Sequence, residues 1–351
     1  MDFNNYTIKQ LKDFCKNTPN SCKKKNEYLD FIKNNIEKIN NNNESKIYDN
    51  NNIKIINNDC MIELNKIEDN SIDCVITDPP YFIDKLDNKW NSNDINNKTA
   101  NSHISHLPKG MAFNKKQVKN LYYYYFELSK ILFKKLKPGG YFLSFSSPRL
   151  YHAIAMACDI AGFEIRDMIN WVYTQSMPKG MSVEHIIKNM KITDKEKEVI
   201  IEKYKNHKTP QIRSCFEPIC VAMKPISSTF IQNELDFNTG LIDFSQKTGI
   251  DNDRVPSNII TTEDIDETFN KNFLVSKPNK IEKGKDNTHI TVKPLSLMEH
   301  LIKLFTKTDS TILDPFLGSG TTALACKNTD RKCIGIELNN EYYNISVNRC
   351  K

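Results

Sequence analysis

Long apolar runs are missing from this sequence of 351 residues, and its first residues do not show the pattern of a signal peptide. A membrane-crossing helix needs about 20 predominantly apolar residues in a row, so we expect no contact with a membrane. The chain is therefore expected to be a soluble intracellular protein of the cytoplasm.

Paired cysteine or histidine spacings of the kind found in metal sites are also missing. Ten cysteines are scattered singly through the chain, for example Cys74, Cys158, Cys220 and Cys333 in apolar stretches. Isolated cysteines of this kind predict reduced thiols in the core, so we expect neither disulfides nor a metal site. Strong charge of one sign is missing too, because the formal net charge of +6 is a mild bias that suits nucleic acid without requiring it.

The sequence does contain short β-branched segments that alternate with helical patterns. With 39% hydrophobic residues, the chain can bury the core of one large domain with additions. Strands that alternate with helices predict an α/β fold with a doubly wound, mostly parallel sheet. The expected strands lie at residues 53–56, 72–76, 141–145, 163–173, 218–223, 311–313 and 333–336.

One motif follows directly after the expected strand at residues 72–76 and reads Asp78-Pro79-Pro80-Tyr81. A buried strand that ends there presents Asp78 at the end of the sheet. The two prolines stiffen the backbone and leave carbonyls without neighbouring donors, and Tyr81 adds a flat face. This combination suits a planar ring that bears an amino group. On these residues alone, however, a plain proline turn is the favoured interpretation.

A second motif follows the expected strand at residues 311–313 and places Gly318 and Gly320 before a helix. Backbone N–H groups at a helix N-terminus bind carboxylates or phosphates. Glu337 ends the next strand, where an acid commonly accepts hydrogen bonds from both hydroxyls of a ribose. Thr321 stands where a phosphate-binding loop would carry lysine, which disfavours nucleotide hydrolysis. The second motif therefore predicts a nucleoside ligand.

Together the two motifs resemble those of the S-adenosylmethionine-dependent DNA amino-methyltransferases, which methylate adenine N6 or cytosine N4. Beside the first motif, the resemblance rests on the segment Asp314-Pro315-Phe316-Leu317-Gly318-Ser319-Gly320-Thr321-Thr322. The catalytic motif precedes the glycine motif, which is the order of the permuted β-type enzymes. The resemblance implies a circularly permuted Rossmann-like methyltransferase fold. In such a sheet the strands that precede Asp78 and Asp314 can be neighbours, because both carry their loops at the carboxyl edge.

The resemblance also implies roles for single residues. Asp78 and the carbonyl of Pro79 would accept the two hydrogens of the target amine, next to Pro80, and Tyr81 would stack on the base. No metal is needed for direct transfer of a methyl group. The glycine turn would hold the methionine part of S-adenosyl-L-methionine, with Glu337 at the ribose and Asp59 at the adenine amine. The full cofactor set is Asp59, Lys293, Asp314, Pro315, Phe316, Gly318, Ser319, Gly320, Thr321, Thr322 and Glu337.

The chain is expected to divide into a permuted catalytic domain with additions, and its expected partner is double-stranded DNA. A segment at residues 82–114, beside Asp78, is expected to be a lid. The segment at 226–288 has little periodicity, so we place it outside the main sheet. Whether two copies pair as a homodimer is left open. The expected parts are a helical SAP-like module with an Asn-rich linker (1–48), the catalytic half (49–175), a helical insertion (176–212), a returning strand (213–225), a target-recognition region (226–288) and the cofactor-binding half (289–351).

Several activities stay open at the level of sequence. Adenine N6 is the preferred target, since a serine in place of Asp78 would have favoured cytosine N4. Methylation of an RNA base or of a protein amide is a more distant alternative, for which asparagine at that position is more typical. A DNA-binding subunit without catalysis is a further alternative, and the intact Asp78, Gly318, Gly320 and Glu337 argue against it.

Overall fold

The computed structural model describes residues 26, 45–79, 115–173, 181–209, 214–247, 255–261, 273–274, 278, 280–283, 287 and 292–351. The strands in these ranges are β1 (Lys46–Asp49), β2 (Ile53–Asn57), β3 (Ile72–Thr77), β4 (Leu136–Phe145), β5 (Glu164–Val172), β6 (Phe216–Met223), β7 (Ile259–Thr261), β8 (Phe273–Leu274), β9 (Thr311–Asp314) and β10 (Lys332–Ile336). The helices are α3 (Cys60–Glu63), the 3-10 turn η1 (Leu64–Lys66), α6 (Lys115–Lys135), α7 (Tyr151–Ile160), α8 (Val183–Lys188), α9 (Asp194–Lys203), α10 (Phe230–Phe237), α11 (Lys280–Lys283), α12 (Leu295–Phe305), α13 (Thr321–Asn328) and α14 (Asn340–Cys350).

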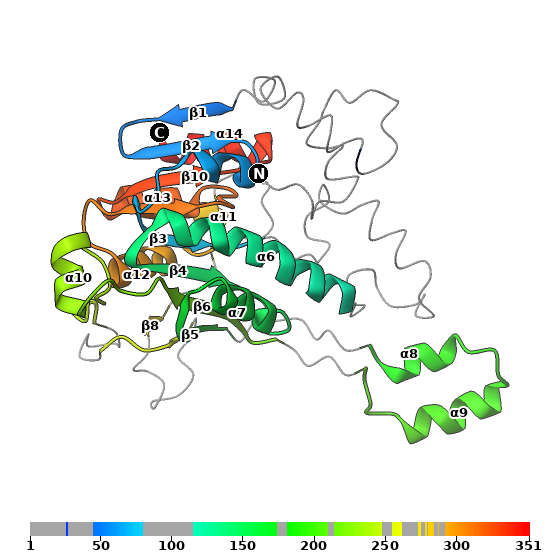
Figure 1. The fold of residues 1–351 in the computed structure, drawn as a ribbon. Coiled ribbons are helices and arrows are strands. Elements are labelled where there is room, and N and C mark those ends of the chain that lie inside the picture. The colour runs from blue at the N-terminus through cyan, green and yellow to red at the C-terminus, as the bar shows by residue number, and fades with distance from the viewer. Residues whose placement is uncertain are drawn as a thin grey trace.

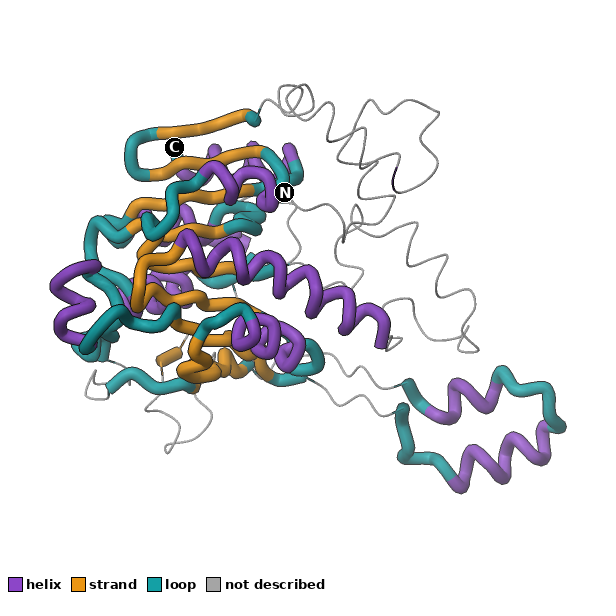
Figure 2. The backbone as a smooth tube through the Cα atoms, in the orientation of Figure 1, coloured by secondary structure: helices purple, strands orange, loops and turns teal. Residues whose placement is uncertain are grey.

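The described strands form one ten-stranded sheet in the order β1-β2-β10-β9-β3-β4-β6-β5-β7-β8 (Figures 1 and 2). Six of its pairs are parallel, while β1 runs antiparallel to β2, and β6 runs antiparallel to β4 and β5. The predicted α/β, doubly wound and mostly parallel sheet is therefore confirmed. The expected neighbourhood of the two motif-bearing strands is confirmed as well, because β3 and β9 pair in parallel.

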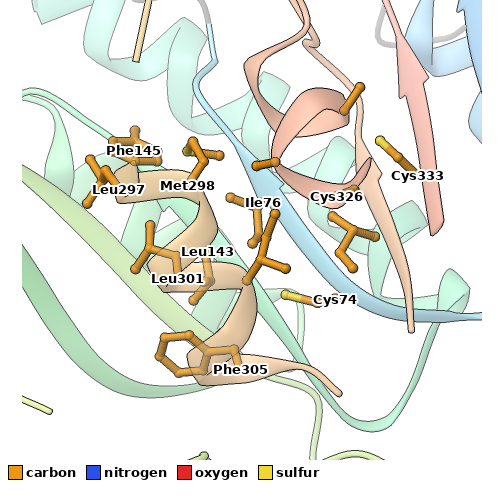
Figure 3. Close-up of a cluster of buried hydrophobic side chains, with 14 of the residues drawn as sticks. Cys74, Ile76, Leu143, Phe145, Leu297, Met298, Leu301, Phe305, Cys326 and Cys333 are labelled. Atoms are coloured by element: carbon orange, nitrogen blue, oxygen red, sulfur yellow. The ribbon is translucent and has the colours of Figure 1, made fainter. Parts of the chain in front are cut away.

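Helices cover both faces of the sheet, and the strand sequences explain why. Successive side chains of a strand point to opposite faces. In β3, Cys74 and Ile76 join a core with α12 and α13 (Figure 3), whereas Val75 joins a second core with α6 and α7. Both faces are apolar, so the sheet can be stable only when it is buried between two layers of helices. In the described ranges, no helix is long and apolar enough to cross a membrane.

Two sequence predictions about the sheet were wrong in part. The predicted linker contains β1, in which Tyr48 pairs with Ile55 and packs against the core, because the tertiary contact outweighs the asparagine-rich surroundings. The region at 226–288 was placed outside the main sheet, yet β7 and β8 extend the sheet edge beside β5. Strands of three and two residues are too short to produce a periodic signal in the sequence.

A third prediction was wrong about where β4 begins. The strand was expected at residues 141–145, but β4 starts at Leu136 and includes Lys137–Gly140. Leu136 pairs with Ile72, and the register shifts before Tyr141 pairs with Cys74. Gly139 takes a φ of 77°, a conformation in which only glycine is unstrained, so the glycine permits a bulge rather than a turn.

The other expected additions are described only in part. The insertion at 176–212 contains α8 and α9, which Figure 1 shows as a pair outside the sheet. An isolated antiparallel β-bridge joins Ser182, just before α8, to Lys208, which follows α9. The predicted N-terminal helical patterns and the predicted lid at 82–114 lie outside the described residues, and they stay predictions.

Candidate active site

The carboxyl ends of β3 and β9 bring the two sequence motifs together. Thr77, the last residue of β3, donates a hydrogen bond from Oγ1 to Asp314 Oδ1 at 2.7 Å. Asp78 follows Thr77 directly, so the catalytic motif starts one residue from this contact. The two halves of the predicted site, far apart in the chain, thus meet through a buried hydrogen bond between side chains.

Asp314 is the anchor of the glycine turn. Its carboxylate also accepts hydrogen bonds from Thr322 Oγ1 at 2.6 Å and from the backbone N–H of Phe316 at 3.0 Å. Burial raises the pKa of Asp314 to about 6, although these hydrogen bonds act in the opposite direction. The carboxylate of Asp314 therefore connects three segments of the protein: the end of β3, the turn itself and the start of α13.

The glycine turn itself fits against α14 and the end of β10. Gly318 and Gly320 take φ values of 58° and 85°, which are unstrained only for glycine. A Cβ on Gly320 would lie 2.7 Å from Cβ of Ser346, so the close approach to α14 excludes any larger residue. The turn leads into α13 at Thr321, where the first backbone N–H groups of the helix have no partner within the helix.

Arg349, on α14, stabilises the turn from outside and was not among the predicted residues. Its Nη1 donates to the carbonyl of Ser319 at 2.8 Å and lies 3.2 Å from Oγ1 of Thr321. Burial lowers the pKa of Arg349 from its ordinary value. A basic residue near the end of a helix is common, so the sequence carried no distinct signal for this contact.

Glu337 lies directly beside the turn, as the sequence predicted. Its Oε2 accepts from the backbone N–H of Gly318 at 2.8 Å, and its Oε1 accepts from the N–H of Asn339 at 2.7 Å. These two bonds fix the orientation of the carboxylate at the end of β10. A carboxylate held this way keeps further lone pairs that can accept hydrogen bonds from a ligand hydroxyl.

Asp59 follows β2, the strand next to β10, and caps α3. Its Oδ1 accepts from the N–H of Met61 at 2.7 Å, and burial raises the pKa of Asp59. Between Asp59 and the glycine turn lies an aromatic pair, in which Tyr124 of α6 is 6.4 Å from Phe316 between ring centroids. The Tyr124 hydroxyl is 3.6 Å from Cys60 Sγ. Tyr124 was missed because it stands within a run of four tyrosines, whose orientation depends on packing.

Asp78 and Lys293 meet at the other end of the site. Lys293 Nζ hydrogen-bonds Asp78 Oδ2 and lies 3.3 Å from Glu217 Oε2. Pro79 is buried, whereas Pro80 and Tyr81 lie outside the described residues. The structure thus places Lys293 against the catalytic acid, and its predicted role at the cofactor stays untested.

The described residues fit a nucleoside with an anionic tail better than a metal. Glu337 offers a fixed acceptor, and the start of α13 offers N–H donors. In the described part of the chain, no three His, Cys, Asp or Glu side chains gather as metal ligands would. The cysteines described there are free thiols, all buried except the half-buried Cys215.

Comparison with known proteins gives matches along most of the chain. The family model of the N6/N4 DNA methylases matches residues 72–348. The Type II methyltransferase M.HindIII of Haemophilus influenzae is 30% identical over 83% of this chain and 93% of its own length. M2.DpnII of Streptococcus pneumoniae, also a Type II methyltransferase, is 27% identical over 82% of this chain and 85% of its own length.

A solved structure shares the fold. The PvuII DNA methyltransferase, described as cytosine-N4-specific, aligns with a TM-score of 0.56 at 17% identity, over 86% of this chain and 87% of that chain. At this identity the likeness concerns the fold alone, and it agrees with the sheet order and the helix layers described above.

Proposed function

This chain belongs to the family of N6/N4 DNA methylases, and on that premise we propose that it transfers a methyl group from S-adenosylmethionine to the N6 amine of an adenine in double-stranded DNA. Methylation of a DNA amino group is the activity of the family. The choice of adenine, the duplex substrate and the roles of single residues are our proposals. The observation that carries the proposed roles of the residues is the hydrogen bond from Thr77 to Asp314, which sets the glycine turn beside Asp78.

Asp78 and Pro79 would activate the amine. An exocyclic amine is a poor nucleophile, because its lone pair is delocalised into the ring. Asp78 and the carbonyl of Pro79 would accept its two hydrogens and draw the nitrogen toward a tetrahedral shape, with the lone pair directed at the methyl group. S-adenosylmethionine supplies an electrophilic methyl group on a sulfonium. The protein's contribution is then position and preorganised dipoles.

The cofactor would lie across the glycine turn. The N–H groups at the start of α13 would face its carboxylate, and Glu337 would accept hydrogen bonds from its ribose hydroxyls. Asp59, at the end of β2, would face the adenine amine. The ring of Phe316, held against Tyr124, would lie between the cofactor and the base. Asp314 would act through the turn, since its carboxylate is occupied by protein donors.

The target base must leave the duplex to reach Asp78, at a cost of a few kcal/mol. We propose that the α8–α9 insertion and the 226–288 region contact the DNA around the flipped base. In the insertion, lysines would chiefly meet phosphates and make binding dependent on salt. The exposed ones are Lys188, Lys191, Lys195, Lys203, Lys205 and Lys208.

Cytosine N4 is the second candidate target, because the matching family comprises both N6 and N4 DNA methylases. The acid at position 78 favours adenine. Both bases present an amine to the same two acceptors, so the candidates differ in the shape of the ring and not in the chemistry at Asp78.

The test is to identify the methylated nucleoside. Purified protein is incubated with methyl-labelled S-adenosylmethionine and DNA amplified in vitro, which carries no methyl groups, and the DNA is digested to nucleosides and separated. Label in N6-methyldeoxyadenosine is the expected result. Label in N4-methyldeoxycytidine would overturn the choice of base. Label on RNA or protein, with none on DNA, would overturn the substrate class.

A further inference from the structure

Three charged side chains from distant parts of the chain meet at the carboxyl edge of the sheet. Asp78 follows β3, and Lys293 lies in the segment that leads into α12. Glu217 lies near the start of β6, and because β6 runs antiparallel to β4, its first residues reach the same edge. Lys293 hydrogen-bonds Asp78 Oδ2 and is 3.3 Å from Glu217 Oε2.

The lysine at the centre of this group is almost completely enclosed. Only 9% of its side chain is exposed, and its Nζ lies 4.9 Å from the centroid of the Phe145 ring. Burial alone would lower the pKa of Lys293, but the charges of Asp78 and then Glu217 outweigh burial, and the pKa lies above its ordinary value. Lys293 therefore carries its charge at neutral pH. A buried ammonium without such partners would be strongly disfavoured.

Within the described ranges, one cation is paired with two carboxylates here. Removing the cation would leave two acids close together with reduced access to water, which raises the cost of ionising both. Further titratable groups interact electrostatically with members of this cluster, namely Tyr173 after β5, Tyr125 of α6 and Asp314 at the end of β9. Neither tyrosine can replace the ammonium, because a phenol never carries a positive charge, and burial, which raises the pKa of both phenols, keeps them neutral.

We propose that Lys293 and Glu217 are positioning residues that hold the carboxylate of Asp78 correctly oriented for the target amine. Glu217 fixes the ammonium through a second ion pair, so that Lys293 does not move with an incoming base. The carboxylate of Asp78 has several lone pairs, and it can accept from an amine while it keeps Lys293. This inference rests on the proposed role of Asp78.

The sequence-based prediction for Lys293 was different, since it assigned the lysine to the cofactor. Among the residues that the structure describes, the ion-pair partners of Lys293 are Asp78 and Glu217. The two assignments differ in what they predict for cofactor affinity, because a cofactor ligand weakens binding when it is removed and a positioning residue of Asp78 does not.

The principal variant is Lys293→Met, which removes the charge and keeps an unbranched side chain against Phe145. We expect affinity for S-adenosylmethionine, measured by calorimetry, to stay within about twofold. The single-turnover rate of methyl transfer at saturating cofactor and DNA should fall about 100-fold. The pH below which the rate declines should also rise, because the carboxylate takes up a proton more readily without the ammonium. The matched control is Lys332→Met, at an exposed position at the opposite edge of the sheet.

Two further variants separate charge from shape. Lys293→Arg keeps the charge, so it should recover part of the rate and the wild-type pH dependence. Glu217→Gln should leave cofactor affinity unchanged and reduce the rate less than Lys293→Met does. If Lys293→Met does not fold, these two variants decide: wild-type rates and pH profiles in both would overturn the proposal.

A measurement without DNA or cofactor separates this proposal from the proposed function. Urea unfolding of the cofactor-free protein should show a larger deficit in unfolding free energy of Lys293→Met relative to wild type at pH 7.5 than at pH 5, since acid neutralises the two carboxylates that have lost the ammonium. An equal deficit in unfolding free energy at both pH values would overturn the proposed coupling of Lys293 to Asp78 and Glu217, even if the protein methylates DNA. Loss of cofactor affinity with an intact rate at saturation would return Lys293 to the cofactor site. Absence of any DNA methylation by wild type would overturn the proposed function. The unfolding experiment would then decide alone whether Lys293 is coupled to Asp78 and Glu217.

Discussion

The replacement Asp314→Asn tests the buried link between the two halves of the site. Asp314 is fully enclosed, and its carboxylate accepts from Thr77, Phe316 and Thr322. Asparagine has nearly the same shape, and its amide oxygen can still accept from the backbone N–H of Phe316. The hydroxyls of Thr77 and Thr322 can rotate to donate or accept, so the variant should fold.

The magnitude follows from the raised pKa of about 6. An unfolded aspartate has a pKa of about 3.9, so the folded protein binds this proton more tightly than the unfolded chain does. For such a group, stability increases as pH falls through the folded pKa and levels off below the unfolded pKa. The full contribution is about 3 kcal/mol, and between pH 7.5 and pH 5 it amounts to about 1 kcal/mol.

Asp314→Asn removes this titration. The unfolding free energy of wild type minus that of the variant should therefore be larger at pH 5 than at pH 7.5 by about 1 kcal/mol. Urea titrations followed by circular dichroism measure it, and Asp330→Asn is the control, at an exposed position of positive φ that asparagine adopts readily. A difference that is equal at both pH values, or larger at pH 7.5, would refute a raised pKa at Asp314.

Two further predictions concern the glycine turn. Gly320→Ala places a Cβ 2.7 Å from that of Ser346, at a position whose backbone is in the left-handed conformation. The replacement should lower the free energy of unfolding, measured by urea denaturation, by about 2–4 kcal/mol. A free energy of unfolding within about 0.5 kcal/mol of wild type, the size of an ordinary surface effect, would contradict the close packing. Arg349→Met removes the donors to Ser319 and Thr321, so calorimetry should show weaker binding of S-adenosylmethionine with little change in the saturated rate of methyl transfer. Unchanged affinity would show that the turn does not depend on Arg349.

Much of this fold and the pairing of the two motifs could be predicted from the sequence. Strand β3 is mostly apolar and stops at an acid and prolines, and parallel strands end at one edge, so Asp78 and Asp314 had to lie near one another if their strands were adjacent. Glu337 could be placed for the same reason.

Other contacts depend on tertiary approach and leave no local signal. Arg349 reads as an ordinary residue near a helix end, and Glu217 as a polar residue at the start of a strand. The partner of Lys293 lies 215 residues away, so only packing of α12 against the sheet reveals it. Strands β7 and β8 gain their stability from the edge of β5, which periodicity within three residues cannot indicate.

The most direct test of Asp78 as the acceptor for the target amine is single-turnover methylation by Asp78→Asn at saturating cofactor, beside calorimetry of cofactor binding. Asparagine keeps the shape but loses the charge. We predict unchanged affinity for S-adenosylmethionine and a rate of methyl transfer to DNA lower by about 10³-fold. A variant that binds the cofactor and methylates DNA at the wild-type rate would contradict the role of Asp78.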